Sequence, residues 1–214
     1  VSGGELLRVL AAGGDARKVI FSGVGKSKEE IKLALAHDIL CFNVESVPEL
    51  HRLSQIANSL GQRARVSLRV NPDVDPKTHP YISTGLKENK FGIAFEDALS
   101  AYGVARDLPG IEVAGIDCHI GSQLLDDAPL LEALDKVIEL ADQLHEMGIH
   151  LHHLDIGGGI GITYDDEKPV AVADYLARLF KRIDQWRAEK YGGAPIVIMF
   201  EPGRSIVGNA GVLL

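Results

Sequence analysis

The stretch Leu151–Gly161, LHHLDIGGGIG, joins a short apolar segment to a turn made almost entirely of glycine. Its first part, Leu151–Ile156, is one of six short runs rich in β-branched and other apolar residues. The other five are Val19–Ser22, Ile39–Val44, Arg65–Val70, Val113–His119 and Ile196–Phe200. Because nearly every position in these runs is apolar, they are typical of strands covered on both faces, as the strands of parallel sheets are.

Longer stretches with helical periodicity separate these runs. They are Glu29–Ala36, Val47–Leu60, Asp97–Arg106, Pro129–Met147 and Val172–Lys190. Ser27 with Glu30, and Ser46 with Glu49, have the spacing of a capping box at the start of a helix. The regular alternation of strand and helix predicts a parallel sheet.

Such a sheet can close in two ways, as an open doubly wound sheet or as a β/α barrel. In a barrel the carboxyl ends of all strands meet at one mouth, whereas in an open sheet only the strands near the switch point share a crevice. Here every predicted strand ends in a polar or glycine cluster. The clusters are Ser22–Lys26, Asn43–Ser46, Arg69–Pro72, His119–Ser122, Asp155–Gly159 and Glu201–Arg204. The pattern therefore favours an α/β fold of the (β/α)8 TIM-like barrel type, incomplete, with about six of the eight strands present.

The bulk composition is that of an ordinary globular protein. Of the 214 residues, 46% are hydrophobic and 24% are charged. The formal net charge of -8 and the scattered lysines and arginines argue against a nucleic-acid surface, which needs clustered cations. No apolar run approaches the ~20 residues that span a bilayer, and no signal-peptide pattern opens the chain, so we expect no membrane partner.

The cysteines and the two ends of the chain carry further expectations. Cys41 and Cys118 both lie in predicted strands, so we expect buried, reduced thiols, which suit the cytoplasm. The chain opens at Val1 rather than at a methionine, and it stops inside an apolar segment at Leu214. We therefore expect residues 1–214 to be an internal fragment of a longer protein.

The glycine turn Gly157–Gly159 has two interpretations. Consecutive glycines let backbone N–H groups surround a phosphate, but they also form tight turns that bind nothing. The dinucleotide fingerprint does not fit, because Ile162 stands where its last glycine must be. The phosphate-loop pattern that ends in Lys26 and Ser27 also fails, so these two residues are better explained as the start of a helix.

Glu201-Pro-Gly-Arg204 follows the last predicted strand. A glutamate at a barrel mouth is costly without a cationic partner, and the protonated nitrogen of a pyridine ring would be one. Arg204 has the planar fork that binds phosphates and carboxylates. The alternative is a local ion pair between Glu201 and Arg204 that has no function.

Histidines and one arginine complete the set of candidates. His119 ends a strand, where it is either a structural hydrogen-bonding residue or a ring stacked on a flat cofactor, with the Ser122 hydroxyl near a phosphate. Arg69 ends another strand and needs an anion. A metal site is conceivable near the start of a third strand, but no Cys or carboxylate completes a ligand set, so we predict none. The histidines there are His150, His152 and His153.

Together the clusters resemble the alanine-racemase-fold group of pyridoxal-phosphate decarboxylases, over the whole of Val1–Leu214. The residues that carry the resemblance are Val1–Leu6, Phe42–Ser46, Arg69–Pro72, His119–Gln123, Asp155–Gly159 and Glu201–Arg204. Within that group, His79–Gly85 and Lys90–Ile93 are similar to the meso-diaminopimelate decarboxylases. Each motif alone is weak, but six in order at matching spacing are specific.

The resemblance implies a cofactor, pyridoxal 5'-phosphate, and a role for each matching residue. Its phosphate would be bound by Gly157, Gly158, Gly159 and Gly203, with Ser122 assisting. His119 would stack on the pyridine ring and Glu201 would pair with the ring nitrogen, both as catalytic residues, while Arg204 would contact cofactor and substrate carboxylate. Racemases of this fold place an arginine against that nitrogen, so Glu201 favours decarboxylation.

The implied activity is the conversion of meso-diaminopimelate to L-lysine and CO2, by a homodimer in the cytoplasm. The family's Schiff-base lysine belongs upstream of Val1, and nothing suggests that Lys26, Lys87 or Lys90 replaces it. The family's C-terminal β domain is also absent from residues 1–214, which would form part of the barrel domain. Two alternatives are open: a related decarboxylase of arginine, ornithine or carboxynorspermidine, or a regulatory homologue that binds the cofactor without catalysis.

Overall fold

The computed structural model describes residues 1–75, 91–190 and 195–212. Its strands are β1 (Ile20–Phe21), β2 (Cys41–Val44), β3 (Ala64–Asn71), β4 (Ile93–Ala94), β5 (Ile111–Asp117), β6 (His153–Asp155) and β7 (Val197–Met199). The helices are α1 (Gly3–Ala11), the 3-10 turn η1 (Ala16–Lys18), α2 (Lys28–Ala36), α3 (Val47–Ser59), α4 (Phe95–Asp107), α5 (Ala128–Glu146), α6 (Val172–Lys190) and α7 (Arg204–Val207).

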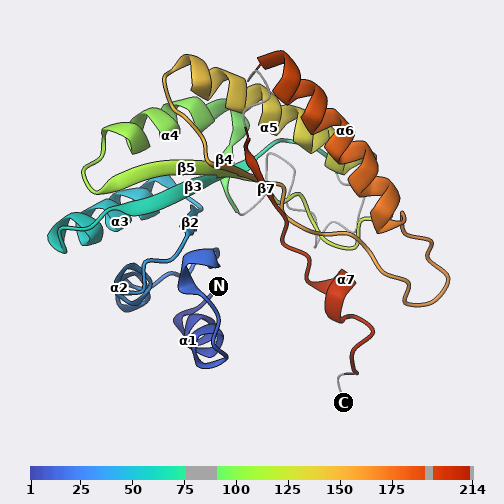
Figure 1. Ribbon diagram of the computed structural model, residues 1–214, viewed down its shortest axis with the longest axis horizontal. Coiled ribbons are helices and arrows are strands. Elements are labelled where there is room, and N and C mark those ends of the chain that lie inside the picture. The colour runs from blue at the N-terminus through green and yellow to red at the C-terminus, as the bar shows by residue number, and fades with distance from the viewer. Residues whose placement is uncertain (76–90, 191–194, 213–214) are drawn as a thin grey trace.

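All strand pairs are parallel, and the strands follow one another across the sheet in the order β1-β2-β3-β5-β6-β7. A doubly wound sheet reverses its strand order at a switch point, and this one does not. Helices α3 to α6 succeed one another along the outer side of the curved sheet (Figure 1). The prediction of an incomplete β/α barrel is therefore confirmed.

The six predicted strands and five predicted helices are all present, with ends that differ by a few residues. Sequence periodicity missed β4, which has two residues and pairs with the end of β3. The capping box at Ser27 and Glu30 is complete. At the second one, Ser46 accepts from the Glu49 N–H, but the Glu49 carboxylate accepts instead from the N–H of Glu45 at 2.9 Å.

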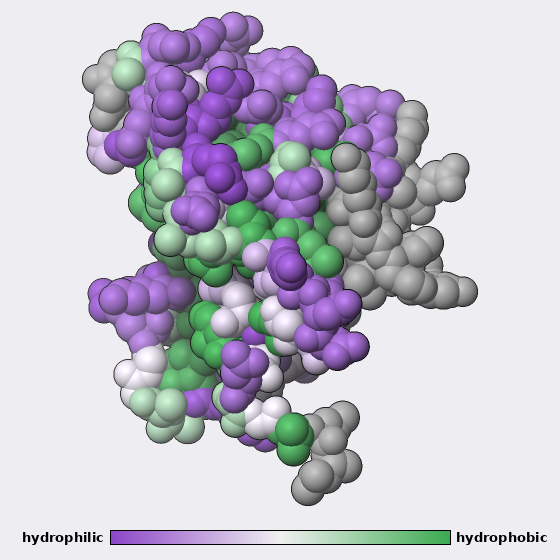
Figure 2. Space-filling view, turned by 90° about the vertical axis from the view of Figure 1, so that its right-hand side faces the viewer, coloured by the Kyte–Doolittle hydropathy of each residue, from purple (hydrophilic) through white to green (hydrophobic). Residues whose placement is uncertain are grey.

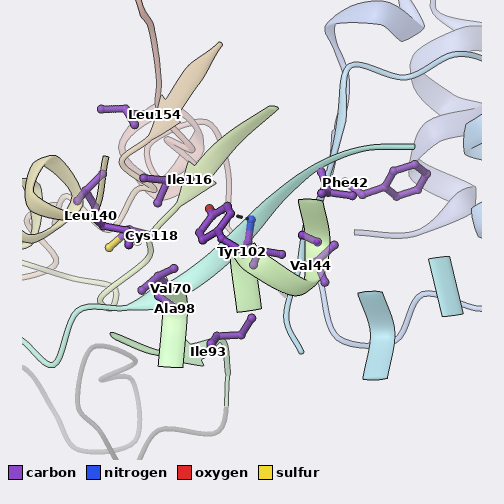
Figure 3. Packing of buried hydrophobic residues seen from close by; sticks show 14 of the residues in the cluster. Phe42, Val44, Val70, Ile93, Ala98, Tyr102, Ile116, Cys118, Leu140 and Leu154 are labelled. Atoms are coloured by element: carbon purple, nitrogen blue, oxygen red, sulfur yellow. Dashed lines mark hydrogen bonds between the residues drawn. The ribbon is translucent and has the colours of Figure 1, made fainter. Parts of the chain in front are cut away.

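A tyrosine hydroxyl repairs an irregularity in the centre of the sheet. The register between β3 and β5 shifts by one residue after Val66, which disrupts the regular ladder there. The fully buried Tyr102 of α4 enters this gap (Figure 3). Its hydroxyl accepts from the Leu68 N–H at 3.3 Å and donates to the Gly115 carbonyl at 2.8 Å. One side chain thus satisfies backbone groups of both strands.

Polar contacts tie the two longest helices to each other. Arg178 of α6 donates at 2.6 Å to Asp127, the residue that precedes α5, and Arg182 donates at 2.6 Å to Asp135 of α5. Farther along, the Trp186 indole donates to Asp142 at 2.8 Å. The described helices include none that is both long and apolar enough to cross a membrane.

Strands β1 and β7 are the edges of the described sheet. Beside β7, a hollow of about 290 Å³ is lined by apolar side chains of α6 and by the glycine turn. Figure 2 shows the side of the molecule that lies at the right in Figure 1. Hydrophobic surface is visible at mid-height on this side, with hydrophilic surface above it. This edge, unlike the interior strands, leaves apolar groups open to solvent, as Val197 shows with 44% of its surface exposed.

Replacing Tyr102 with phenylalanine should destabilise the fold by about 1–3 kcal/mol, because the Leu68 N–H and the Gly115 carbonyl would remain buried without their partner. Urea unfolding monitored by circular dichroism measures this loss. Tyr164→Phe is the matched control, since Tyr164 is 65% exposed and its change should fall within about 0.5 kcal/mol. Equal stability of Tyr102→Phe and the control would contradict the role of the hydroxyl.

Candidate functional site

The carboxyl ends of β5, β6 and β7 bring the main predicted site residues together. The Gly158 N–H points to His119 Nδ1 at 3.3 Å, and that nitrogen is 4.0 Å from Glu201 Oε2. The Glu201 N–H donates to the Gly157 carbonyl at 2.8 Å. A glycine turn, an imidazole and a carboxylate therefore share one corner of the barrel mouth, as the strand-end clusters predict.

The glycine turn fits closely between the neighbouring strand ends. A Cβ at Gly157, Gly158 or Gly159 would lie 2.3, 2.1 or 2.2 Å from a backbone oxygen. Gly157 and Gly159 also have φ angles of +71° and +100°, which favour glycine. Packing alone thus requires these glycines, whether or not a phosphate binds. Gly203 differs, because a Cβ there would meet nothing within 4 Å.

Glu201 is oriented by a short chain of hydrogen bonds from the first two strands. Its Oε1 accepts from the Ser22 hydroxyl at 3.0 Å, and that hydroxyl accepts from the Asn43 amide at 3.1 Å. No lysine or arginine of the described segments lies within 4.0 Å of the Glu201 carboxylate. The local ion pair with Arg204, the alternative interpretation of this motif, is not formed. A fixed carboxylate at the mouth is thus available to a positively charged ligand.

Two further carboxyl groups lie behind Glu201, and the sequence analysis did not select them. Asp117 ends β5 and Asp155 ends β6, and one oxygen of each lies within 4.8 Å of the others and of a Glu201 oxygen. Asp117 and Asp155 are 2% and 1% exposed, and within the part of the chain that the structure describes Asp117 Oδ1 and Asp155 Oδ2 have no hydrogen-bond partner. Acidic residues at the ends of three consecutive predicted strands were the available signal.

Burial and mutual repulsion make these acids hard to ionise. Burial, with the charges of Asp155 and Glu201, raises the pKa of Asp117 well above its usual range. Burial and Glu201 raise the pKa of Asp155 to about 6, although its Oδ1 accepts from the Gly157 N–H at 3.0 Å. Ionisation of Asp117 is therefore strongly disfavoured in this cluster. A cation bound beside Glu201 would relieve the repulsion within this cluster.

His119 is neutral in this setting. Burial and the nearby Arg69 lower its pKa, and the opposing effect of Glu201 is smaller. Because Nδ1 faces the Gly158 N–H, that nitrogen accepts and Nε2 carries the proton. The imidazole therefore presents an uncharged ring at the mouth.

The two basic residues on neighbouring strand ends are already engaged. Arg69 donates to Glu45 Oε1 at 3.0 Å, which supplies the anion that its position requires. Lys26 is 2% exposed, and its ammonium group donates to the carbonyls of Gly23 and Asn43, each at 2.6 Å, and to the Glu49 carboxylate at 2.8 Å. Lys26 has therefore used all three protons and cannot act as a free amine.

Arg204 and Ser122 lie on the loops around the same corner. Arg204 begins α7 and donates to Gln123 Oε1 at 3.1 Å, with its guanidinium 5.6 Å from the centre of the Tyr164 ring. Ser122 is half-buried, in the loop that leads from His119 to Gln123. The segments His79–Gly85 and Lys87–Lys90 lie outside the described residues.

The histidines near the start of β6 are at the opposite end of the strands. His153 is fully buried, with Nε2 2.7 Å from the Ser67 hydroxyl and Nδ1 3.2 Å from His152 Nδ1. Burial, and secondarily His152, lowers the His153 pKa to about 4. The ring also fills the space that a side chain at Gly115 would need, at 2.4 Å. His153 is therefore a core residue, and its contacts are structural.

Comparison with known proteins agrees with this geometry. The family model described as "Pyridoxal-dependent decarboxylase, pyridoxal binding domain" matches residues 1–208. Diaminopimelate decarboxylase of Pseudomonas fluorescens is 57% identical over 215 residues, and that of Vibrio cholerae is 55% identical over 214. Both alignments cover 100% of this chain and 50% of the relative. The chain thus spans about half the length of the curated relatives it matches.

Solved structures give the same result. Diaminopimelate decarboxylase from Helicobacter pylori complexed with L-lysine superposes with a TM-score of 0.86 at 47% identity, covering 96% of this chain and 50% of that one. Lysine decarboxylase from Selenomonas ruminantium superposes with a TM-score of 0.81 at 28% identity, covering 95% of this chain and 49% of that one. The family model covers residues 1–208, and the fold and the strand-end site agree with it. The chain therefore belongs to the pyridoxal-dependent decarboxylases and corresponds to their pyridoxal binding domain.

Proposed function

We propose that the protein carrying this chain uses pyridoxal 5'-phosphate to decarboxylate meso-diaminopimelate, releasing CO2 and L-lysine. The observation that carries the proposal is Glu201, a hydrogen-bonded carboxylate without a lysine or arginine partner in the described segments, beside a neutral imidazole and a glycine turn. The substrate is supported by relatives named diaminopimelate decarboxylase at 55–57% identity over the whole chain.

The described residues fit the cofactor. The glycine turn Gly157–Gly159 would lie against its phosphate. Because the N–H groups of Gly157 and Gly158 already donate to Asp155 and His119, the N–H groups of Gly159 and Gly203 would hold the phosphate with help from the Ser122 hydroxyl, and His119 would lie against the ring. Glu201 would accept a hydrogen bond from the ring nitrogen and keep it protonated. When bound, the protonated ring supplies an electron sink for the electron pair left by the departing CO2. Ser22 and Asn43 hold the Glu201 carboxylate in a fixed direction.

The uncharged state of His119 suits this role. A second cation against the ring would compete with the pyridinium for the charge of Glu201. Because burial and Arg69 keep the pKa of His119 low, the ring contributes stacking without that competition. Arg204 would provide the cation for the substrate carboxylate, since no carboxylate in the described segments lies within ion-pair distance of it.

The architecture of the whole protein is part of the proposal. Residues 1–214 would form part of the barrel domain, and the Schiff-base lysine and a C-terminal β domain would come from sequence outside them. The match to half of each relative's length supports this. We also propose a homodimer in the cytoplasm. The buried, unpaired Cys41 and Cys118, whose thiol pKa values burial raises, suit a reducing compartment.

The direct test is turnover by the complete protein. With pyridoxal 5'-phosphate it should convert meso-diaminopimelate to L-lysine, measured by chromatography of the product, and should act at least about 100-fold more slowly on lysine, arginine and ornithine. A preference for one of those three would favour the related basic amino-acid decarboxylase. Cofactor absorbance without turnover of any of them would favour the regulatory homologue.

Glu201→Gln should keep the size and hydrogen bond of the side chain but remove its charge. We expect kcat to fall roughly 100-fold or more, because a neutral amide does not hold the ring nitrogen in its protonated state. Steady-state kinetics and the cofactor absorption spectrum measure the two effects. Glu189→Gln on the exposed side of α6 is the control. Near-normal kcat for Glu201→Gln would refute the role of the carboxylate.

Asp155→Asn should stabilise the cofactor-free protein at pH 8. The Asp155 pKa is raised to about 6 from 3.8, so the folded state binds its proton more tightly than the unfolded state. Wild-type stability therefore falls as pH rises from about 4 to about 6, and the charge remains unfavourable above that range. The asparagine avoids this loss, so we expect a gain of about 1–3 kcal/mol at pH 8 that disappears towards pH 4.

Urea unfolding of the cofactor-free protein at pH 4.5 and pH 8 measures this difference. Asp166→Asn, at an exposed position in the loop after β6, should show no change between the two pH values. A loss of stability on Asp155→Asn at pH 8 would show that the carboxylate is favourable as a charge, contrary to the electrostatics of the cluster.

A further inference from the structure

Gln123 joins the loops that follow β5 and β6. The backbone makes the first part of this connection, because the Leu124 N–H donates to the Gly159 carbonyl at 2.8 Å and the Gly161 N–H donates to the Leu124 carbonyl at 2.9 Å. The Gln123 side chain continues it. Its Nε2 donates to the Ile162 carbonyl at 2.6 Å, and its Oε1 accepts from the Ile162 N–H at 3.1 Å. The side-chain amide thus replaces a peptide group in the ladder.

The same amide oxygen holds Arg204. Gln123 Oε1 accepts from Arg204 Nη1 at 3.1 Å, so one side chain fixes both the loop after β6 and the arginine at the start of α7. Gln123 keeps this position with a φ of +56°, a left-handed conformation that is unfavourable for a non-glycine residue. A left-handed residue that points its side chain at three groups is expected where the contact matters to function.

Tyr164 provides the second contact with Arg204. The guanidinium lies 5.6 Å from the centre of the ring, within the range of a cation–π interaction. The turn that carries the ring is braced by Glu167, whose Oε2 accepts from the N–H groups of Tyr164 and Asp165 at 2.9 and 2.8 Å. Tyr164 is therefore held in place although it is 65% exposed.

Both contacts are made by uncharged groups, and this distinguishes Arg204 from Arg69. Arg69 is paired with the Glu45 carboxylate. Arg204 has an amide oxygen on one nitrogen and an aromatic face beside it, and within the described segments no carboxylate comes within 4.0 Å of it. Its direction is fixed while its charge and its other N–H donors remain available. A guanidinium prepared in this way suits bidentate binding of a carboxylate.

We propose that Gln123 and Tyr164 are positioning residues that hold the Arg204 guanidinium ready for a carboxylate of the amino-acid substrate. The proposal rests on the proposed function and extends it to two residues that bind neither cofactor nor substrate themselves. Neutral partners are essential to it, because an acid at position 123 would pair with the cation that the substrate needs.

The test uses the complete holoenzyme with Gln123→Met, which keeps the length of the side chain and removes its three hydrogen bonds. We expect KM for meso-diaminopimelate to rise about tenfold, with kcat and the cofactor dissociation constant within twofold of wild type. Gln123→Glu should also raise KM, because the new carboxylate competes for Arg204. Tyr164→Leu should raise KM about threefold or more, whereas Tyr164→Phe, which keeps the ring, should stay near wild type.

Gln143→Met is the matched control, the same change at a half-buried position of α5 away from the mouth. A KM within twofold of wild type for Gln123→Met would overturn the proposal. A parallel loss of kcat and cofactor affinity would overturn it as well, since Gln123 would then support the fold in general.

A crystal structure of the Gln123→Met protein tests, independently of turnover, whether Gln123 positions Arg204. Displacement or disorder of Arg204 and the Tyr164 turn is expected, and an unmoved Arg204 would overturn the proposal. If wild type binds the cofactor but does not act on meso-diaminopimelate, the proposed function fails, and the positions of Arg204 in the two crystal structures still decide whether Gln123 holds it.

Discussion

The rest of the site depends on the absence of three Cβ atoms. The glycines of the turn after β6 lie against the backbone oxygens of Cys118, Gly121 and Glu201, in the space that side chains would need. This contact locks the ends of three strands at one spacing, so the imidazole of His119 and the carboxylate of Glu201 meet without help from a ligand. The mouth is thus preorganised by the backbone, and its chemistry is added by side chains that the backbone already places.

The charged groups at the mouth differ in whether they are paired within the described segments. Glu45 neutralises Arg69 and Glu49 neutralises Lys26. Asp117 is buried, and burial with the charges of Asp155 and Glu201 raises its pKa. Within the described segments Glu201 has no lysine or arginine partner and Arg204 has no carboxylate partner, and each is oriented by neutral hydrogen-bonding groups. A carboxylate and a guanidinium held apart in this way leave room for a ligand that carries both kinds of charge, at some cost in stability to the empty fold.

Local periodicity was enough to predict the six principal strands and the helices between them, since burial on both faces leaves a nearly continuous apolar run. The rule that parallel strands end together was enough to bring His119, Gly158 and Glu201 to one corner. Contacts across long sequence separations could not be predicted. In the sequence Asp117 is an ordinary strand residue and Gln123 an ordinary loop residue. Strand β4 is too short to show any periodicity. The ion pair of Glu201 with Arg204, the alternative interpretation of that motif, is not formed, and Arg204 instead contacts Gln123 and Tyr164.

The environment of Lys26 bears on chemoselectivity. An amine reacts with an aldehyde only when it has lost a proton and turns its lone pair outward. The Lys26 ammonium would have to give up contacts with Gly23, Asn43 and Glu49 before it could do so. Although it lies in the loop between β1 and α2, this lysine should not react with carbonyl reagents, and imine formation requires an amine with fewer contacts.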